Sequence, residues 1–397
     1  MTTDITMLRR ATAMPPSEMA PRYQELLRRL TTAARTNLGF PAATDIDYRP
    51  LAPLLGVLLN NLGDPWTDGV WPLHAKGIER DVLSFFAQLF RAPAGWTGYL
   101  TSGGTEGNHY GLWRGRTRLP NAVAYHSAAA HYSVPKAEHL LGLPSVTVAA
   151  AATGEIDYTD LQRQAARFPS RPAIVTATIG TTMTEAVDDV QRIHQALDAA
   201  GNTHRYVHSD AALAGVPLAV TADRPAFDLG DGADSISISG HKFFGTPLVC
   251  GVVIDGRGLG DLPPTIRYTG APDTSITGSR TGLGAVMLAH ALDVLGLPGL
   301  LDRAQRARSL AAYACHSLQA IGWPHWRNPA AFTVMLREPP QTVRARWHLP
   351  STDGWSHLIC MPGITTRHID ALIRDLALLL DGAQPSVVER SATVLRD

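Results

Sequence analysis

Between residues 123 and 254 the sequence alternates short β-type runs with stretches of helical pattern. The β-type runs cover 123–125, 145–149, 173–177, 206–209, 235–239 and 251–254. The helical stretches, at 104–116, 134–141, 158–167 and 187–199, precede or separate some of these runs. Such alternation is typical of strands joined by crossover helices, which build a mostly parallel sheet buried between helices. The sequence therefore predicts an α/β fold with such a sheet at its centre.

The segments on both sides of this region predict a helical start and a smaller domain at the end. Leu26, Leu27 and Leu30 stand at helical spacing and predict an amphipathic helix over 18–36. Further helices are expected at 51–59, 79–90, 283–295, 300–321, 342–347 and 365–380, and further strands at 331–336 and 357–361. We therefore expect an N-terminal helical segment (1–50), a large domain (51–300) and a small C-terminal α+β domain (301–397).

Charge, cysteine content and hydropathy exclude several classes of function. Lysine plus arginine equal aspartate plus glutamate at 35 each, so no net field attracts nucleic acid or an anionic membrane. The three cysteines are far apart and odd in number, which argues against a disulfide framework and fits a reducing compartment. We find no signal peptide at the start and expect no later membrane span. The expectation is a cytoplasmic enzyme without nucleic-acid or membrane partners.

One strand end carries a lysine in an unusual setting. The alternating run 235–239 is broken by Gly240, which is followed by His241, Lys242 and two phenylalanines. A partly dry, aromatic setting lowers the pKa of an amine from about 10.4, as a lysine that attacks a carbonyl requires. Lys242 is therefore a candidate to hold pyridoxal phosphate. The alternative is a strand-end lysine that only caps a loop.

Two further strand ends or turns offer groups that suit the same cofactor. Gly104 and Thr105 open a helix after a glycine-rich turn, where backbone amides and a hydroxyl form a cradle for phosphate. A glycine-rich helix cap without a ligand is the alternative. Asp210 ends a buried strand, and a buried carboxylate needs a cation or a hydrogen-bond donor. In pyridoxal enzymes that partner is the ring nitrogen.

The remaining candidates also follow strands. His131 stands where an imidazole can lie flat against an aromatic ring, although a structural histidine is the alternative. Thr181 adds a hydroxyl after the run 173–177. Open α/β sheets bind ligands at the carboxyl ends of their strands, so we expect these groups to converge. His204 and His208 stand four apart, which suits a metal on a helix, but their segment is strand-like and no metal is predicted.

With these residues in place, the sequence resembles the group II pyridoxal-phosphate-dependent amino-acid decarboxylases, and within them the branch of bacterial histidine and plant serine decarboxylases. The match runs from about residue 37 to 372 through ordered motifs at 60–65, 103–108, 131–134, 154–157, 179–182, 210–212, 239–242, 278–280 and 361–362. The resemblance implies a fold-type I homodimer whose large domain binds pyridoxal phosphate at the subunit interface. It also implies decarboxylation of a histidine- or serine-like L-amino acid to the amine and carbon dioxide.

The resemblance implies a role for each candidate. Lys242 would carry the cofactor covalently, Asp210 would pair with its ring nitrogen, and His131 would stack on its ring. The other implied cofactor-binding residues are Gly104, Thr105, Thr181, Ser239, His241 and, from the partner chain, Ser279. Tyr268 matches a loop tyrosine that protonates the carbon from which carbon dioxide leaves, which makes it a catalytic candidate beside Lys242 and His131.

The substrate is less well defined by sequence. Phe40, Trp71 and His74 are candidate substrate contacts, and Phe40 replaces a tyrosine common in histidine decarboxylases. A lost pocket hydroxyl can change substrate discrimination strongly. Lys76 and Arg267 would suit an acidic side chain, or are surface charges. A modified amino acid, a decarboxylating oxidase, an aminotransferase and a non-catalytic scaffold are the remaining alternatives.

Overall fold

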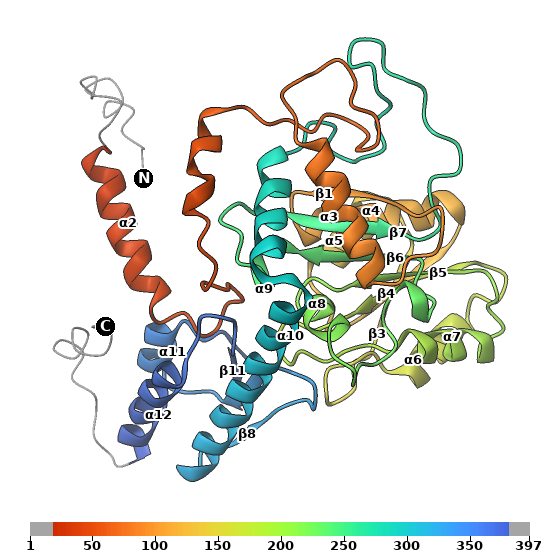
Figure 1. Ribbon diagram of the computed structural model, residues 1–397. Helices are drawn as coiled ribbons and strands as arrows, with labels where there is room; N and C mark the ends of the chain where they lie inside the picture. The colour runs from red at the N-terminus through yellow and green to blue at the C-terminus, as the bar shows by residue number, and fades with distance from the viewer. Residues whose placement is uncertain (1–18, 381–397) are drawn as a thin grey trace, which may run out of the picture.

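A seven-stranded sheet forms the centre of the protein (Figure 1). The structure is a computed structural model and describes residues 19–380. The strands lie in the order β1-β7-β6-β5-β4-β2-β3. Their bounds are β1 Thr97–Thr101, β2 Val123–Ser127, β3 Ser145–Val148, β4 Ala173–Thr178, β5 Arg205–Asp210, β6 Ser235–Ser239 and β7 Gly251–Asp255. Only β7 runs antiparallel to its neighbours β1 and β6, so the predicted mostly parallel sheet is confirmed.

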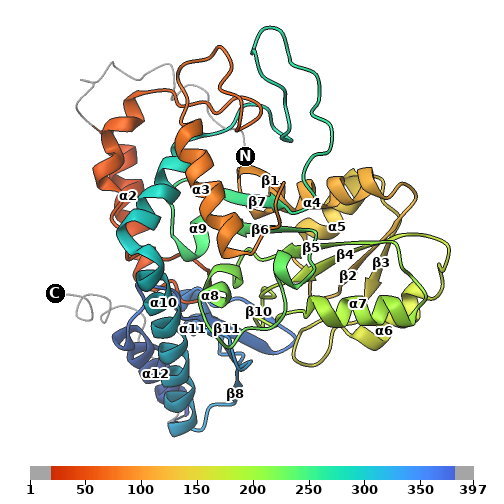
Figure 2. The same cartoon turned by 45° about the vertical axis from the view of Figure 1, so that its right-hand side comes forward.

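Helices cover both faces of this sheet (Figure 2). The helices of the large domain are α3 Lys76–Leu89, α4 Gly104–Arg118, α5 Ser133–Leu140, α6 Tyr158–Ala165, α7 Val190–Ala199, α8 Gly215–Ala219 and the short α9 Gly240–Phe243. The chain moves across the sheet in one direction through α4 and α5, and in the other through α6 and α7. Because crossovers are right-handed, this reversal puts the two pairs of helices on opposite faces.

The C-terminal domain has a sheet of its own, with strand order β10-β11-β9-β8. Its elements are β8 His325–Trp326, β9 Thr333–Arg337, α11 Gln341–Trp347, β10 Ser351–Thr352, β11 Trp355–Ile359 and α12 Thr366–Leu380. Its apolar core also contains Leu38 and Ala43. Ile359 N donates to Leu38 O at 2.7 Å, so the stretch after the first helix packs on this domain. The predicted small α+β domain is therefore joined by part of the N-terminal segment.

The long element α10 Gly282–Ala320 connects the two domains (Figure 1). Two helices were predicted here, and they follow one another across a kink at Gly296, whose φ of 57° is not helical. Pro298 follows, and a proline cannot donate the helical hydrogen bond. Among the described residues, α10 is the one helix long and apolar enough to cross a membrane, a test that buried core helices also pass. The kink in α10 and the buried charge of Arg303, further along the same helix, are typical of a helix in a protein core.

The N-terminal helix α2 Pro21–Ala34 lies at the edge of the molecule (Figure 1), and none of its residues is buried. Tyr23, Leu26, Leu27 and Leu30 on this helix are each exposed by 41% or more. The 3-10 helix η1 Arg49–Gly56 follows and replaces the α-helix expected at 51–59. Its Leu55 is 68% exposed. An amphipathic helix gains most of its stability by covering its apolar side, so this chain leaves the apolar side of α2 available for a partner.

Candidate active site

A cavity of about 230 Å³ lies at the carboxyl ends of the parallel strands. Seven of the predicted site residues line it: Gly104, Thr105, His131, Asp210, Ser239, His241 and Lys242. They come from four places in the chain, namely the start of α4, the turn after β2, the end of β5 and the β6–α9 junction. The prediction that these side chains converge at the carboxyl ends of the strands is therefore confirmed.

Lys242 lies on α9, directly after β6. Its amine faces the cavity that also holds the Asp210 carboxylate. Burial lowers the pKa of the Lys242 amine, and the negative charge of Asp210 opposes that shift. A lowered pKa leaves more of the amine in the neutral, nucleophilic form near pH 7. Lys242 therefore has the environment that covalent attachment to an aldehyde requires.

Asp210 ends β5 and is 4% exposed. Its Oδ2 accepts a hydrogen bond from Asn108 Nδ2 at 2.7 Å, and its Oδ1 accepts one from the backbone N–H of Ala212 at 3.2 Å. Both partners donate, which suits an ionised carboxylate. Such a carboxylate keeps lone pairs free for a protonated ring nitrogen in the cavity.

The start of α4 is shaped to receive an anion. A Cβ at Gly104 would lie 2.7 Å from Ser239 Oγ, so only glycine lets the first turn of α4 approach β6 this closely. Gly103 before it has a φ of 132°, which an L-residue rarely adopts. The unpaired N–H groups of this turn stand beside the hydroxyls of Thr105 and Ser239 and the His241 ring. This donor set fits a phosphate group.

His131 lies in the turn between β2 and α5 and lines the cavity. Its Nδ1 is 2.8 Å from Ser133 Oγ. Burial lowers the pKa of the His131 imidazole, against the opposing charge of Asp210, and so favours the neutral ring. A neutral, flat imidazole beside Lys242 and Asp210 suits contact with the face of an aromatic ring.

The turn after β4 supplies hydroxyls, but not the one predicted. Thr181 Oγ1 lies 2.8 Å from Thr184 Oγ1 and accepts from Ala186 N at 3.0 Å, so its hydroxyl serves the turn itself. Thr178 and Thr182 line the cavity instead. Gly180 between them has a φ of 97°, which breaks the alternation of side-chain directions that a continued strand would have. The Thr181 side chain, predicted to bind the cofactor, therefore does not line the cavity, whereas the Thr182 side chain does.

The small domain holds this turn in place. The buried Glu185 accepts hydrogen bonds from the backbone N–H groups of Phe332 and Thr333, the latter at 2.8 Å. Burial raises the pKa of Glu185 to about 7. Asn328 Nδ2 donates to Thr184 O at 2.9 Å from the same side. The second domain thus fixes one wall of the cavity.

Besides Thr181, five predicted site residues lie outside this cavity. Tyr268 is 80% exposed and Phe40 is 59% exposed. Ser279 Oγ accepts from Asn60 Nδ2 at 3.3 Å, and Trp71 Nε1 donates to Leu73 O at 2.8 Å. His74 Nδ1 accepts a hydrogen bond from Lys76 N at 3.3 Å. None of these side chains contributes to the Lys242 cavity of its own chain.

Most of these outlying residues belong to two loops that project together from the large domain (Figure 1). Backbone hydrogen bonds join Asp64 N to Pro272 O and Val70 N to Thr269 O, at 2.9 and 2.8 Å. The loops that carry Trp71 and Tyr268 therefore form one unit on the surface.

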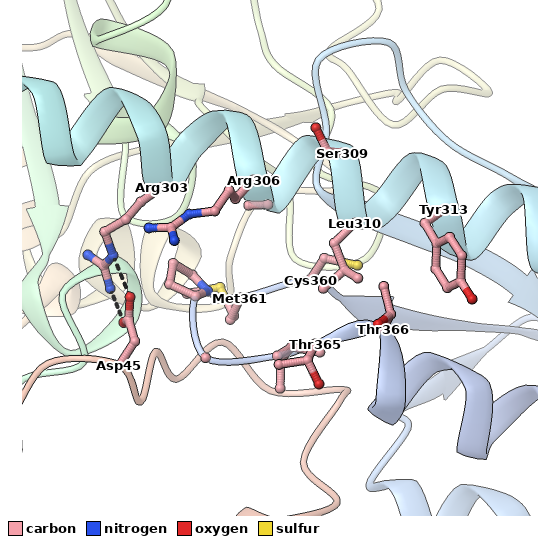
Figure 3. Close-up of a pocket in the computed structure, with 14 residues that line it drawn as sticks. Asp45, Arg303, Arg306, Ser309, Leu310, Tyr313, Cys360, Met361, Thr365 and Thr366 are labelled. Carbon is pink, nitrogen blue, oxygen red and sulfur yellow. Dashed lines mark hydrogen bonds and ion pairs between the residues drawn. The ribbon is translucent and has the colours of Figure 1, made fainter.

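A second cavity, of about 520 Å³, lies between α10 and the segment after β11 (Figure 3). At one end Arg303 Nε donates to Asp45 Oδ2 at 3.0 Å, which neutralises both groups. Most of its wall comes from apolar or small side chains such as Leu310 and Met361. None of the predicted site residues lines it, so the smaller Lys242 cavity is the one equipped for chemistry.

Sequence reasoning missed Asn108, although it stands in a motif that had been singled out. It lies one turn after Gly104 on the same side of α4 and is 1% exposed. The available signal was the spacing of four, which puts both residues on one helix face.

Comparison with known proteins identifies the family. The sequence pattern of the pyridoxal-dependent decarboxylase conserved domain matches residues 107–264. The histidine decarboxylase of Mesorhizobium japonicum is 43% identical over 359 residues, which cover 90% of this chain and 97% of that relative. The chain belongs to the pyridoxal-dependent decarboxylases. This decarboxylase is also 35% identical over 345 residues to serine decarboxylase 2 of Oryza sativa subsp. japonica, covering 86% of this chain and 74% of that one.

The fold comparison agrees with the family. The crystal structure of L-methionine decarboxylase from Streptomyces sp. 590 matches with a TM-score of 0.81 and 26% identity, over 92% of this chain and 96% of that one. The fold-type I architecture, the decarboxylase activity and the use of pyridoxal phosphate are thereby confirmed. The lysine, carboxylate and anion cradle of the cavity fit that cofactor.

Proposed function

We propose that this decarboxylase converts L-histidine to the corresponding imidazole amine and carbon dioxide. The observation that carries the proposal is the 43% identity to a histidine decarboxylase along almost the whole of both chains. L-Serine is the second candidate, supported by 35% identity to a serine decarboxylase. An acidic substrate has less support, because Lys76 is 1% exposed and its Nζ donates to Thr67 O at 2.5 Å.

In the proposed mechanism each side chain has one task. Bound pyridoxal phosphate supplies an electron sink for the pair released when the substrate carboxylate departs as carbon dioxide. Lys242 would hold the cofactor, and Asp210 would keep its ring nitrogen protonated; both side chains line the cavity. The start of α4 with Ser239 and His241 binds the phosphate, while His131 orients the ring. Tyr268 of a second copy of the chain would deliver the proton that replaces the carboxylate.

Screening tests the choice of substrate. Purified enzyme with pyridoxal phosphate is expected to release carbon dioxide and amine in equal amounts from L-histidine, with a kcat/KM at least about tenfold above that for L-serine. A ratio of this size corresponds to about 1.4 kcal/mol of discrimination, within the reach of one pocket contact. Higher kcat/KM for serine or an acidic amino acid would contradict the proposal. Ammonia and peroxide as products would indicate an oxidase.

We also propose a homodimer in which each chain completes the site of the other. Two observations support it: α2 exposes a row of apolar side chains, and Tyr268 and Ser279 lie outside the cavity of their own chain. A second copy would cover α2 and bring the projecting loops to the Lys242 cavity. We further propose a cytoplasmic location, supported by three cysteines that are all free.

Subunit mixing tests the shared site. Lys242→Ala and Tyr268→Phe chains are each expected to be inactive as homodimers. After random exchange of subunits, hybrids contain one site with both residues intact, and activity is expected to return to about a quarter of the wild-type value. If each chain used its own Tyr268, no mixture would regain activity. Sedimentation of the wild type as a monomer would also contradict the proposal.

A further inference from the structure

The Asn108 amide stands at the centre of a hydrogen-bond network behind the cavity. Its Nδ2 donates to Asp210 Oδ2 at 2.7 Å and to Ser133 Oγ at 3.0 Å. Its Oδ1 accepts from His208 Nε2 and from Ser237 Oγ, both at 3.0 Å. Both donors and both lone pairs of the amide are therefore used, in a residue that is 1% exposed.

The Asp210 carboxylate sets which way this amide points, because a carboxylate can only accept a hydrogen bond, and the amide in turn sets the tautomer of His208. His208 is fully buried, and burial lowers its pKa to about 4, so its ring carries one proton at neutral pH. Its Nδ1 is 2.8 Å from Ser235 Oγ, which can donate, whereas its Nε2 faces the carbonyl oxygen of Asn108, which can only accept. The proton therefore lies on Nε2. A reversed Asn108 amide would put its NH₂ against this N–H and its oxygen against the Asp210 carboxylate.

The same network determines the tautomer of His131. Ser133 Oγ accepts from Asn108, so its own hydrogen is free to donate to His131 Nδ1 at 2.8 Å. The backbone N–H of Ser133 also points at that nitrogen, at 3.2 Å. With two donors directed at Nδ1, the single proton of the neutral His131 ring belongs on Nε2.

Glycines on α4 allow this network to form. A Cβ at Gly111 would lie 2.1 Å from His208 Nδ1, and one at Gly107 would lie 2.5 Å from Ser237 Cβ. Side chains at these positions would push α4 away from β5 and β6 and separate Asn108 from its partners.

We propose that Asn108, Ser133 and His208 are positioning residues that hold Asp210 as a hydrogen-bond acceptor and His131 as the tautomer protonated on Nε2. One amide thus prepares both the group that meets the ring nitrogen and the group that meets the ring face. The inference rests on the proposed roles of Asp210 and His131. It means that His131 presents an N–H to the cavity, and that protonating Nδ1 costs two existing hydrogen bonds.

Nitrogen NMR of the holoenzyme labelled with ¹⁵N-histidine tests the tautomer directly, with His131→Gln to assign the signals. The wild type is expected to show a bare Nδ1 and a protonated Nε2 at His131. In Ser133→Ala one donor is lost, so the signals should move toward a mixture of tautomers. The acid limb of the kcat profile should shift to higher pH, and kcat should fall about tenfold. Thr176→Val removes a buried hydroxyl on β4 that has no hydrogen-bond partner within residues 19–380, and it should change neither readout.

A proton on Nδ1 of wild-type His131 would overturn the inference, whether or not the Ser133→Ala protein folds. Unchanged His131 signals and an unchanged acid limb in folded Ser133→Ala would overturn it as well. The tautomer is measured without turnover. A protein with the expected tautomer that decarboxylates no amino acid would therefore refute the proposed function and leave the network intact.

Discussion

Replacing Lys242 with alanine is expected to reduce turnover by about 10⁴-fold or more and to remove the visible absorption of covalently bound cofactor. The reason is that, among the described residues, Lys242 is the one lysine lining the cavity that also contains Asp210 and the phosphate cradle at the start of α4. An amine free in solution cannot replace an amine held at that position. Absorption spectra and carbon dioxide release from purified protein measure both effects.

Lys136→Ala is the matched control for this variant. Lys136 is exposed on α5, where its Nζ lies 5.2 Å from the centre of the Tyr132 ring. Its removal should leave the spectrum unchanged and kcat within about twofold, as for most surface substitutions. A Lys242→Ala protein that retained the wild-type spectrum would show that the cofactor is attached elsewhere.

Replacing Asp210 with asparagine is expected to lower kcat by about 10²–10³-fold while the protein stays folded. The amide is nearly isosteric, so the bond with the Ala212 N–H can persist, but the negative charge that favours a protonated ring nitrogen is lost. Without that charge the ring withdraws electrons less strongly. Cofactor binding should weaken as well, which equilibrium dialysis measures separately from kcat.

Asp189→Asn makes the same chemical change outside the cavity. Asp189 caps α7 by accepting from Arg192 N, and asparagine caps helices equally well. Its kcat and melting temperature should match the wild type. If Asp210→Asn behaved like this control, the carboxylate would have no part in activating the cofactor.

The parallel sheet was predictable because its strands are short apolar runs with helices between them, as in Ala173–Thr178. Strand β1 was not predicted, because its second residue is Gly98 and glycine is uncommon in strands. That glycine is required by its neighbour: a Cβ there would lie 2.3 Å from Val253 O. Such a contact between segments 155 residues apart leaves no local signal.

The part of the candidate site that lies at the ends of parallel strands was predictable from the sequence. Asp210 and Lys242 follow parallel strands, so topology alone brings them together. Thr181 was predicted in place of its neighbour Thr182, because the positive φ of Gly180 changes the direction of the side chains that follow it. Asn108 was missed because its four partners come from β5, β6 and α5, whose proximity to α4 only the folded chain shows.

Borohydride reduction followed by peptide mass spectrometry tests the central claim most directly. The chain has three lysines, Lys76, Lys136 and Lys242, so the reduced cofactor can mark only one of three side chains or the N-terminus. We predict stoichiometric labelling of Lys242, and its loss when an amino-acid substrate is present during reduction. Labelling of Lys76 or Lys136 in place of Lys242 would contradict the assignment of this cavity as the active site.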